Sequence, residues 1–368
     1  MDKRINVTHL KMSIRSSIFS CVKLGGVFSS RFCAVPHSYR AGYKFNIRYY
    51  SSKNKSDINY DGTIGSLAYS PSSETEKSLS DDIESVELIY DKYSPNEPSY
   101  KNPIIFLHGL FGSKVNNRAV SKQLVKLLDR DVYCIDLRNH GESPHINRHD
   151  YPSMSKDVEN FILENEIIDP ILIGHSMGAK VAMSVCLRKP KLPSMLISVD
   201  NAPIDLTGNT KGFGKFVMYI RQLQKITRDK SLRTLKDCDS ILAEVEPELG
   251  IRQFLLTNIK RNPNFNENKN SDTEFPYVSR VPLDILLKNL DSISSFPFDY
   301  TKNIWTKPSL FIRGEKSMYI ADEFIAQIGA FFPQFELRDI DAGHWVISEK
   351  PKEFVELVVD WIERKEDL

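Results

Sequence analysis

The sequence predicts an α/β fold in which a mostly parallel sheet has helices on both faces and carries an inserted helical cap. From about residue 86 onward, apolar runs of strand length alternate with segments of helical periodicity, and the connections between them are short. The apolar runs also lack the regular polar alternation of a half-exposed strand. This is expected of parallel strands that are buried on both faces.

Composition limits the classes of protein that this chain can belong to. Its 368 residues are 41% hydrophobic and 26% charged, enough for one large domain or two ordinary ones with a sizeable core. Residues 1–56 contain 11 Lys and Arg but one acid, whereas residues 57–368 contain 38 Lys and Arg and 47 acids. The body is therefore acidic, which argues against a nucleic-acid-binding surface. Five scattered cysteines, without a C-x-x-C pair, indicate reduced thiols rather than disulfides or zinc.

The first 50 residues have the pattern of a mitochondrial transit peptide. They are rich in Arg, Lys and Ser, and apolar residues recur every four positions beside basic ones at Leu10, Ile14, Ile18 and Val22. The stretch IRYYSS predicts cleavage near Tyr50 and Ser51. No apolar run reaches the roughly 18 residues of a membrane span. Residues 1–50 are thus expected to direct the protein to mitochondria, and the polar residues 51–83 to form a linker.

The first half of the body, which begins at residue 84, alternates strand and helix. Five elements are expected before residue 170: a strand over 86–94, a strand that opens 103–113, a helix over 116–130, a strand that opens 131–143, and a helix over 154–166. Pro95 ends the first strand. One-sided apolar residues predict the two helices, among them Val120 and Leu124 in the first and Val158 and Phe161 in the second.

The second half repeats the alternation around one insertion. The expected elements are a strand and a helix within 170–190, a strand over 194–203, the cap over about 204–303, a strand over 308–317, a helix over 321–332, a strand over 335–341, and a helix over 351–365. Pro190 ends the helix of the first pair. The cap is assigned because this segment is helical and more charged than its surroundings. It is interrupted by a polar stretch at 261–275.

The stretch GHSMG, residues 174–178, is the centre of the predicted active site. It matches G-x-S-x-G at the end of a strand and the start of a helix, which is the pattern of a nucleophile elbow. Such a turn exposes the hydroxyl of Ser176, while the following helix points its N-terminus at developing negative charge. Glycines are required on both sides because the strand and helix pass too closely for side chains. Ser176 is therefore the predicted nucleophile.

A nucleophilic serine needs a histidine base and an acid that orients it. His344, in DAGHW, follows the last predicted strand and is the expected base. For the acid, Asp200 at the end of the next strand after the elbow is preferred, with Glu315 as the alternative. Asp339 and Asp341 precede His344 too closely to reach round to it.

The loops FLHGLFGS and DLRNHGES are expected to shape the site. The backbone N–H groups of Leu110 and Met177 are the predicted oxyanion hole, each able to lower the barrier by about 3 kcal/mol. His108 is expected to be structural. Arg138 and His140 are expected to form hydrogen bonds with the loop backbone rather than to act in catalysis.

Together these residues resemble the α/β-hydrolase superfamily over roughly residues 84–366. The stretches LHGLFGSKVNNR, DLRNHGESPH, VDNAP, IRQFLLTN and FELRDIDAGHW are similar to the mitochondrial α/β-hydrolase-domain proteins of fungi and animals. SLRTLKDCDSILAE and IGAFFPQFELRDIDAGHWVISEKP are most similar to the yeast ethanol acetyltransferases. That resemblance implies ethyl acetate formation from acetyl-CoA and ethanol, with side hydrolysis of esters and thioesters. It places the nucleophile at Ser176, the acid at Asp200 and the histidine at His344.

Three functions stay open at this point. The first is an alcohol acetyltransferase with acetyl-CoA and a short alcohol as substrates. The second is a serine esterase or thioesterase that uses water, because both reactions pass through the same acyl-serine. The third is an inactive hydrolase fold that binds a partner. No G-x-G-x-x-G opens a helix, so residues that contact CoA are not assigned, and neither a cofactor nor a metal site is expected.

Overall fold

The computed structural model describes residues 82–207, 210–265 and 275–367, so the predicted transit peptide and nearly all of the linker lie outside the described residues. A seven-stranded sheet has the order β1-β3-β2-β4-β5-β8-β9, and its neighbours are parallel except β1 and β3. Its strands are β1 (Tyr90–Tyr93), β2 (Ile104–Leu107), β3 (Val132–Ile135), β4 (Ile171–His175), β5 (Met195–Val199), β8 (Ser309–Gly314) and β9 (Phe335–Ile340). The predicted fold class is therefore confirmed.

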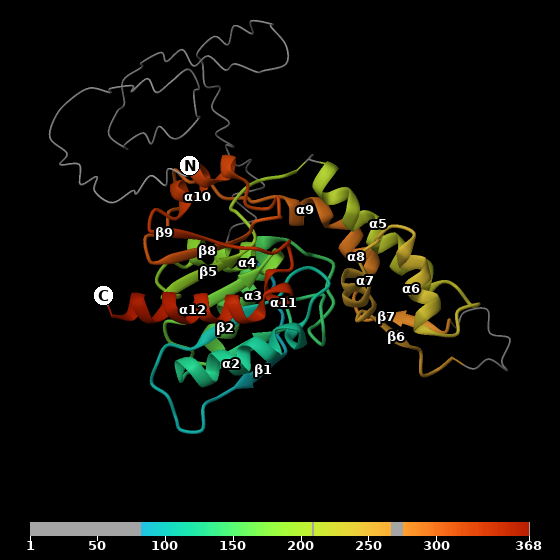
Figure 1. Ribbon diagram of the computed structural model, residues 1–368, viewed down its shortest axis with the longest axis horizontal. Coiled ribbons are helices and arrows are strands. Elements are labelled where there is room, and N and C mark those ends of the chain that lie inside the picture. Colours follow the sequence, from blue (N-terminus) through green and yellow to red (C-terminus); the bar gives the residue numbers. More distant parts are fainter. Residues whose placement is uncertain (1–81, 208–209, 266–274, 368) are drawn as a thin grey trace, which may run out of the picture. The chain divides into compact units, whose positions relative to one another are not determined.

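Helices pack on both faces of this sheet (Figure 1). They are α2 (Arg118–Leu128), α3 (Tyr151–Glu164), α4 (Met177–Arg188), α10 (Ile325–Phe331), α11 (Val346–Glu349) and α12 (Pro351–Glu366). Alternate strand residues face opposite layers: Ile104 and Phe106 pack with α2 and α12, whereas Ile105 and Leu107 pack with α3 and α4. This two-sided burial explains why the strands are apolar throughout.

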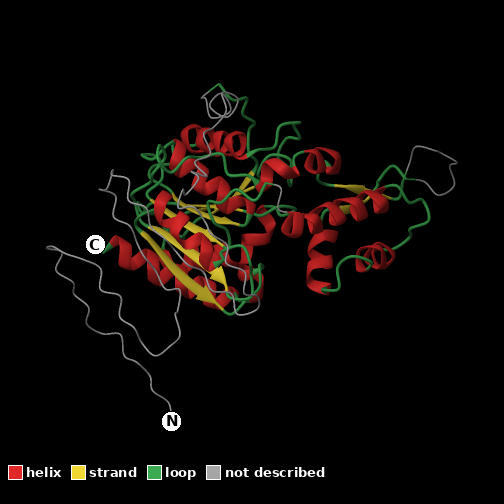
Figure 2. Ribbon diagram, turned by 90° about the horizontal axis from the view of Figure 1, so that it is seen from above, coloured by secondary structure: helices red, strands yellow, loops and turns green. Residues whose placement is uncertain are grey.

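The segment between β5 and β8 forms the cap. It contains α5 (Thr210–Thr227), α6 (Leu235–Ala243), α7 (Leu249–Leu256), α8 (Leu283–Lys288) and α9 (Leu290–Ser294). Figures 1 and 2 show these helices gathered to one side of the sheet. The sequence predicts helices here, but the structure also contains a short antiparallel pair, β6 (Ile259–Arg261) and β7 (Tyr277–Ser279). Three residues per strand are too few to give a periodic signal.

Two boundaries differ from the predicted ones for identifiable reasons. Helix α3 begins at Tyr151, three residues before the predicted start, because the Asp150 carboxylate accepts a hydrogen bond from the Ser153 amide at 2.8 Å. Pro152 lies in the first turn, where its missing N–H costs nothing. Ile83, assigned to the linker, is buried in the body. The folded body therefore begins slightly before residue 84.

Candidate active site

Ser176 occupies the turn between β4 and α4. Its backbone has φ 53° and ψ −116°, a conformation that strains a residue with a side chain. A Cβ on Gly174 would lie 2.2 Å from the carbonyl oxygen of Gly178, and one on Gly178 would lie 2.4 Å from that of Leu107. Only glycine fits at either position. The two glycines thus allow β2, β4 and α4 to approach closely enough to hold Ser176 in the turn.

The structure brings Ser176, His344 and Asp200 together. The Oγ of Ser176 lies 2.9 Å from Nε2 of His344, and Nδ1 of His344 lies 2.7 Å from Oδ2 of Asp200. Ser176 follows β4, Asp200 follows β5, and His344 lies between β9 and α11. Because the Nδ1–H group donates to the carboxylate, Nε2 is left to accept a proton from the serine hydroxyl. This arrangement can generate a serine nucleophile.

The other carboxylates considered from the sequence lie elsewhere. Glu315 is exposed, and its amide donates to the carbonyl oxygen of Ile340 at 2.9 Å. Asp339 accepts from Arg313 at 2.7 Å, and Asp341 pairs with a neighbouring lysine at 2.5 Å. Asp339 and Asp341 thus have local partners, and the acid that contacts His344 is Asp200, the preferred candidate.

The end of β8 and the loop after it support Asp200 through two contacts that the sequence did not predict. The Ser317 hydroxyl donates to Oδ2 of Asp200 at 2.5 Å, and the Gly314 amide donates to Oδ1 at 3.1 Å. Asp200 is fully buried. With the His344 bond, the carboxylate therefore accepts three hydrogen bonds, which fix its orientation in the absence of water.

Two further side chains hold His344. The ring of Tyr319 stacks on its imidazole, with the ring centres 4.1 Å apart and the planes 24° from parallel. His175 contacts the backbone of His344 through Nε2, 2.8 Å from the carbonyl oxygen. Burial, together with nearby His344, lowers the pKa of His175 to about 4, so that ring is neutral at pH 7. Burial also raises the pKa of Tyr319 to about 12, which keeps its phenol protonated.

The two predicted oxyanion donors lie in segments that adjoin Ser176. A Cβ added to Gly109 would be 3.2 Å from the Cβ of Ser176, so the loop that carries Leu110 passes against the nucleophile. A hydrogen bond from the Gly112 amide to the Gly109 carbonyl oxygen, 2.9 Å long, closes this loop. Met177 is the first residue of α4, where a backbone N–H has no acceptor within its own helix. Both segments can present N–H groups to a carbonyl oxygen bound at Ser176.

His108 has a structural role, as the sequence predicts. Its Nε2 accepts from the Leu137 amide at 3.0 Å, so the Nδ1–H group donates to the Gly109 carbonyl oxygen at 2.8 Å. Burial lowers the pKa of His108 to about 4. The neutral ring therefore joins the loop after β2 to the end of β3.

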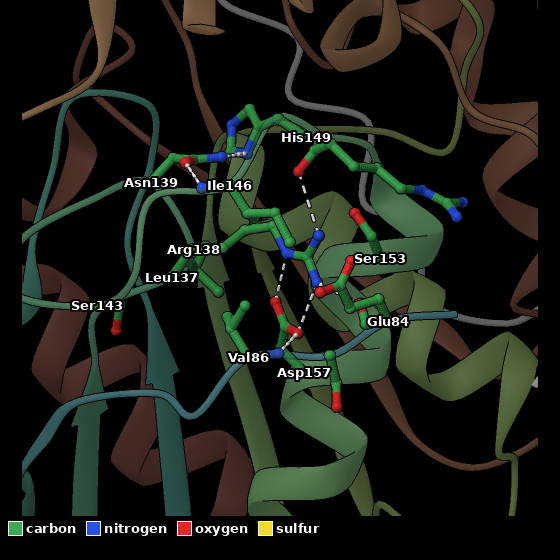
Figure 3. A network of polar contacts seen from close by, with 12 residues as sticks. Glu84, Val86, Leu137, Arg138, Asn139, Ser143, Ile146, His149, Ser153 and Asp157 are labelled. Carbon is green, nitrogen blue, oxygen red and sulfur yellow. Dashed lines mark hydrogen bonds and ion pairs between the residues drawn. The ribbon is translucent and has the colours of Figure 1, made fainter. Parts of the chain in front are cut away.

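Arg138 forms the expected backbone contacts and one strong contact that was not predicted (Figure 3). It donates to the carbonyl oxygens of Glu84 at 3.0 Å and Arg148 at 3.1 Å. Its Nε and Nη2 also donate to the two carboxylate oxygens of Asp157 on α3, at 2.6 and 2.7 Å. This bidentate pair is fully buried. Arg138 thus holds the loop against α3, away from the nucleophile.

The described residues contain neither a metal-binding cluster nor a membrane-spanning helix. Across 82–207, 210–265 and 275–367, no three His, Cys, Asp or Glu side chains are grouped so as to hold a metal ion. Over the same ranges, no helix combines the length and the apolar character needed to cross a bilayer.

Comparisons with known proteins agree with this geometry. Residues 102–351 match the alpha/beta hydrolase fold family. A probable alcohol acetyltransferase of Saccharomyces cerevisiae is 47% identical over 282 residues, which cover 74% of this chain and 80% of the relative. A mouse (Mus musculus) sn-1-specific diacylglycerol lipase, ABHD11, is 34% identical and aligns with 70% of this chain and 80% of its own length. Among solved structures, a marine microorganism esterase superposes with a TM-score of 0.65 at 32% identity, covering 75% of this chain and 99% of the esterase.

Proposed function

The chain belongs to the α/β-hydrolase family, and from that premise we propose that it is a serine-dependent alcohol acetyltransferase. It would form acetate esters, such as ethyl acetate, from acetyl-CoA and a short alcohol. The observation that carries the proposal is the hydrogen-bonded chain from Ser176 through His344 to Asp200. The similarity to a probable alcohol acetyltransferase supports the choice of acceptor.

The first half-reaction transfers the acetyl group to the enzyme. His344 takes the hydroxyl proton as Ser176 attacks the thioester carbonyl of acetyl-CoA, and the resulting oxyanion is bound by the amides of Leu110 and Met177. The C–S bond then breaks. His344 returns the proton to the sulfur, CoA leaves as the thiol, and an acetyl-serine remains. Acetyl-CoA is thus a substrate and is consumed in each cycle.

The second half-reaction decides between transfer and hydrolysis. His344 deprotonates an alcohol or a water molecule, which attacks the acetyl-serine and releases an ester or acetate. An apolar surround would favour the alcohol by excluding water. Trp345 lies beside His344, with ring centres 5.6 Å apart, and contacts Phe254 of α7 at 4.5 Å. The cap therefore supplies aromatic surface next to the base. One buried methylene gives only about 0.8 kcal/mol, so the discrimination should be incomplete.

A second candidate is an esterase or thioesterase with water as the main acceptor. It is favoured by the similarity to a diacylglycerol lipase and to an esterase. An inactive binding partner is a weaker third candidate, because the complete set of Ser176, His344 and Asp200 is in hydrogen-bonding contact.

Product analysis distinguishes these candidates. Purified enzyme with acetyl-CoA and ethanol should yield both ethyl acetate and acetate, and the ester fraction should rise with ethanol concentration. Ser176→Ala should abolish both products together, because they share one intermediate. Acetate alone at high ethanol would support the hydrolase, and no product with no fluorophosphonate labelling of Ser176 would support the inactive partner.

The proposed location is the mitochondrion, on the basis of the basic, amphipathic pattern of residues 1–50. A fluorescent reporter fused to residues 1–56 should enter mitochondria. Cytosolic fluorescence from that fusion would contradict the proposal.

A further inference from the structure

Phe111 follows the predicted oxyanion donor Leu110, and both of its backbone polar groups are held. Its N–H donates to Nε2 of His140 at 3.2 Å, and its carbonyl oxygen accepts from Nδ2 of Asn258 at 2.9 Å. Its φ of 63° is in the left-handed region, which is unfavourable for a bulky residue. Such a conformation persists where surrounding contacts determine it. These two hydrogen bonds therefore restrain the backbone directly beside Leu110.

The two partners of Phe111 come from different parts of the molecule. His140 lies in the loop between β3 and α3, within the sheet body, whereas Asn258 lies in the cap between α7 and β6. The side chain of Phe111 also faces the cap, with its ring centre 6.3 Å from that of Phe216 on α5. One residue of the oxyanion loop (residues 108–113) is thus attached to the body on one side and to the cap on the other.

The body side of this attachment is fixed. Nδ1–H of His140 donates to the Arg138 carbonyl oxygen at 3.0 Å, which leaves Nε2 as the acceptor for Phe111. Burial and the neighbouring ring of His108 lower the pKa of His140 to about 3. His140 is therefore a neutral acceptor at pH 7.

The cap side is also firmly built. Asn258 is buried, its backbone N–H donates to the Leu255 carbonyl oxygen at 3.1 Å, and its own carbonyl oxygen accepts from the Arg280 amide at 2.7 Å. These bonds hold its side chain on a short turn between α7 and the β6–β7 pair. Asn258 is the last residue of IRQFLLTN, one of the stretches that carry the family resemblance. The structure gives this residue a direct contact with the oxyanion loop.

We propose that Asn258 is a positioning residue through which the cap sets the geometry of the oxyanion hole. This inference rests on the proposed serine mechanism but applies equally to transfer and to hydrolysis, because both need the same oxyanion site. When Asn258 is in place, the Leu110 amide is aimed at the developing oxyanion. When the cap shifts or the amide is lost, Phe111 can relax its left-handed backbone, and the donor moves away.

Asn258→Asp is the most direct test. The substitution keeps the shape of the side chain but replaces the N–H donor with a carboxylate oxygen that repels the Phe111 carbonyl oxygen. We expect the rate constant for fluorophosphonate labelling of Ser176 to fall by about 10- to 100-fold, since a lost oxyanion donor costs about 10²–10³ and a displaced one less. The kcat for ester hydrolysis should fall in parallel, with KM changed by less than about 3-fold.

Asn262→Asp is the matched control. The Nδ2 of Asn262 also donates to a backbone carbonyl oxygen, that of Phe275 at 2.9 Å, but this bond lies wholly within the cap. It should lower stability without slowing the labelling of folded enzyme. With probe in excess, protein that is unfolded and does not refold during the assay lowers the final amount of labelled enzyme and not the rate constant, so the rate constant separates positioning from folding. Asn258→Ala, which adds no charge, replaces the aspartate variant if that variant yields no folded protein.

The outcomes separate the two proposals. If Asn258→Asp and Asn262→Asp label at the wild-type rate, the positioning inference is wrong and the serine mechanism stands. If the wild-type enzyme itself is not labelled at Ser176, the proposed function fails first. Slow labelling of the Asn258 variants alone, with KM nearly unchanged, supports the inference.

Discussion

Arg138 and Lys180 are both buried basic side chains, but they have different kinds of partner. Arg138 forms a bidentate ion pair with Asp157, and the same carboxylate accepts from the Val86 amide at 2.8 Å (Figure 3). Lys180, on α4, instead donates to three backbone carbonyl oxygens: Ile204 at 2.8 Å, Ser294 at 3.1 Å and Ser295 at 3.0 Å. The faces of Tyr151 and Phe296 lie 5.5 and 5.9 Å from its ammonium.

The difference shows which of the two buried basic side chains changes its charge near neutral pH. The Arg138 pair joins the entry segment, the loop after β3 and α3, and a guanidinium stays charged at any working pH. Lys180 joins α4 to both ends of the cap. Burial lowers the pKa of Lys180 to about 7, although Asp205 partly opposes the shift. The body therefore contains a permanent buried charge, whereas the base of the cap contains a buried amine that loses its charge near neutrality.

Asp157→Ala should give the largest effect, because it leaves the Arg138 guanidinium buried without its counter-charge. Removing one member of a buried pair costs about 3–5 kcal/mol. We expect the free energy of unfolding to fall by this amount, as measured by urea denaturation monitored by circular dichroism.

Asp360→Asn is the control for that prediction. Asp360 accepts from Arg364 at 3.0 Å on α12, but both side chains are largely exposed. Its loss should change the free energy of unfolding by less than about 0.5 kcal/mol, as for other exposed pairs. Equal effects of the two substitutions would remove the distinction between a buried and an exposed ion pair here.

Lys180→Met should give a smaller effect that appears only as a pH dependence. The unfolded chain protonates this lysine up to about pH 10.5, whereas the folded chain releases the proton near pH 7. The unfolded state thus binds more protons over this interval, so stability rises with pH. Between pH 7 and 9.5, the wild-type protein should gain about 3 kcal/mol relative to Lys180→Met, in denaturation curves recorded at both pH values.

Lys352→Met serves as the reference for the lysine prediction. Lys352 is 86% exposed on α12, and its removal should leave the pH dependence of the wild type unchanged. Parallel curves for wild type and Lys180→Met would show that Lys180 titrates like an ordinary lysine. In that case the contrast with Arg138 would disappear.

The residues of the site were predictable where a local motif marks them or where they directly follow a particular strand. Ser176 is marked by glycines two positions away on each side, and both prove to be sterically required. His344 follows the last strand of a parallel sheet, whose carboxyl edge collects functional groups. The same logic ranked Asp200 above Glu315, and Asp200 is the acid beside His344. The mostly parallel sheet was predictable from the alternation of strands and helices, which is a property of the whole sequence, whereas the strand order was not predicted.

The supporting contacts were not predictable, because they join residues with no local pattern. Ser317 reaches Asp200 across 117 positions, and Asn258 reaches Phe111 across 147. In the sequence, Lys180 looks like an ordinary helix residue. Its three acceptors are backbone carbonyl oxygens, which cannot be identified from residue types. Such contacts depend on how the cap and loops are seated in space.

Lys180, at the base of the cap, also indicates where the cap could be replaced by another one. One ammonium contacts the carbonyl oxygens of Ile204, at 2.8 Å, and Ser294, at 3.1 Å, so these two oxygens, where the chain enters and leaves the insertion, are at most about 6 Å apart. A gap of this size can be closed by two or three residues. The roughly 90 residues between these points are therefore attached as an exchangeable module. A foreign cap with similarly spaced ends could be grafted at the same joint, provided that it restored an amide opposite the oxyanion loop.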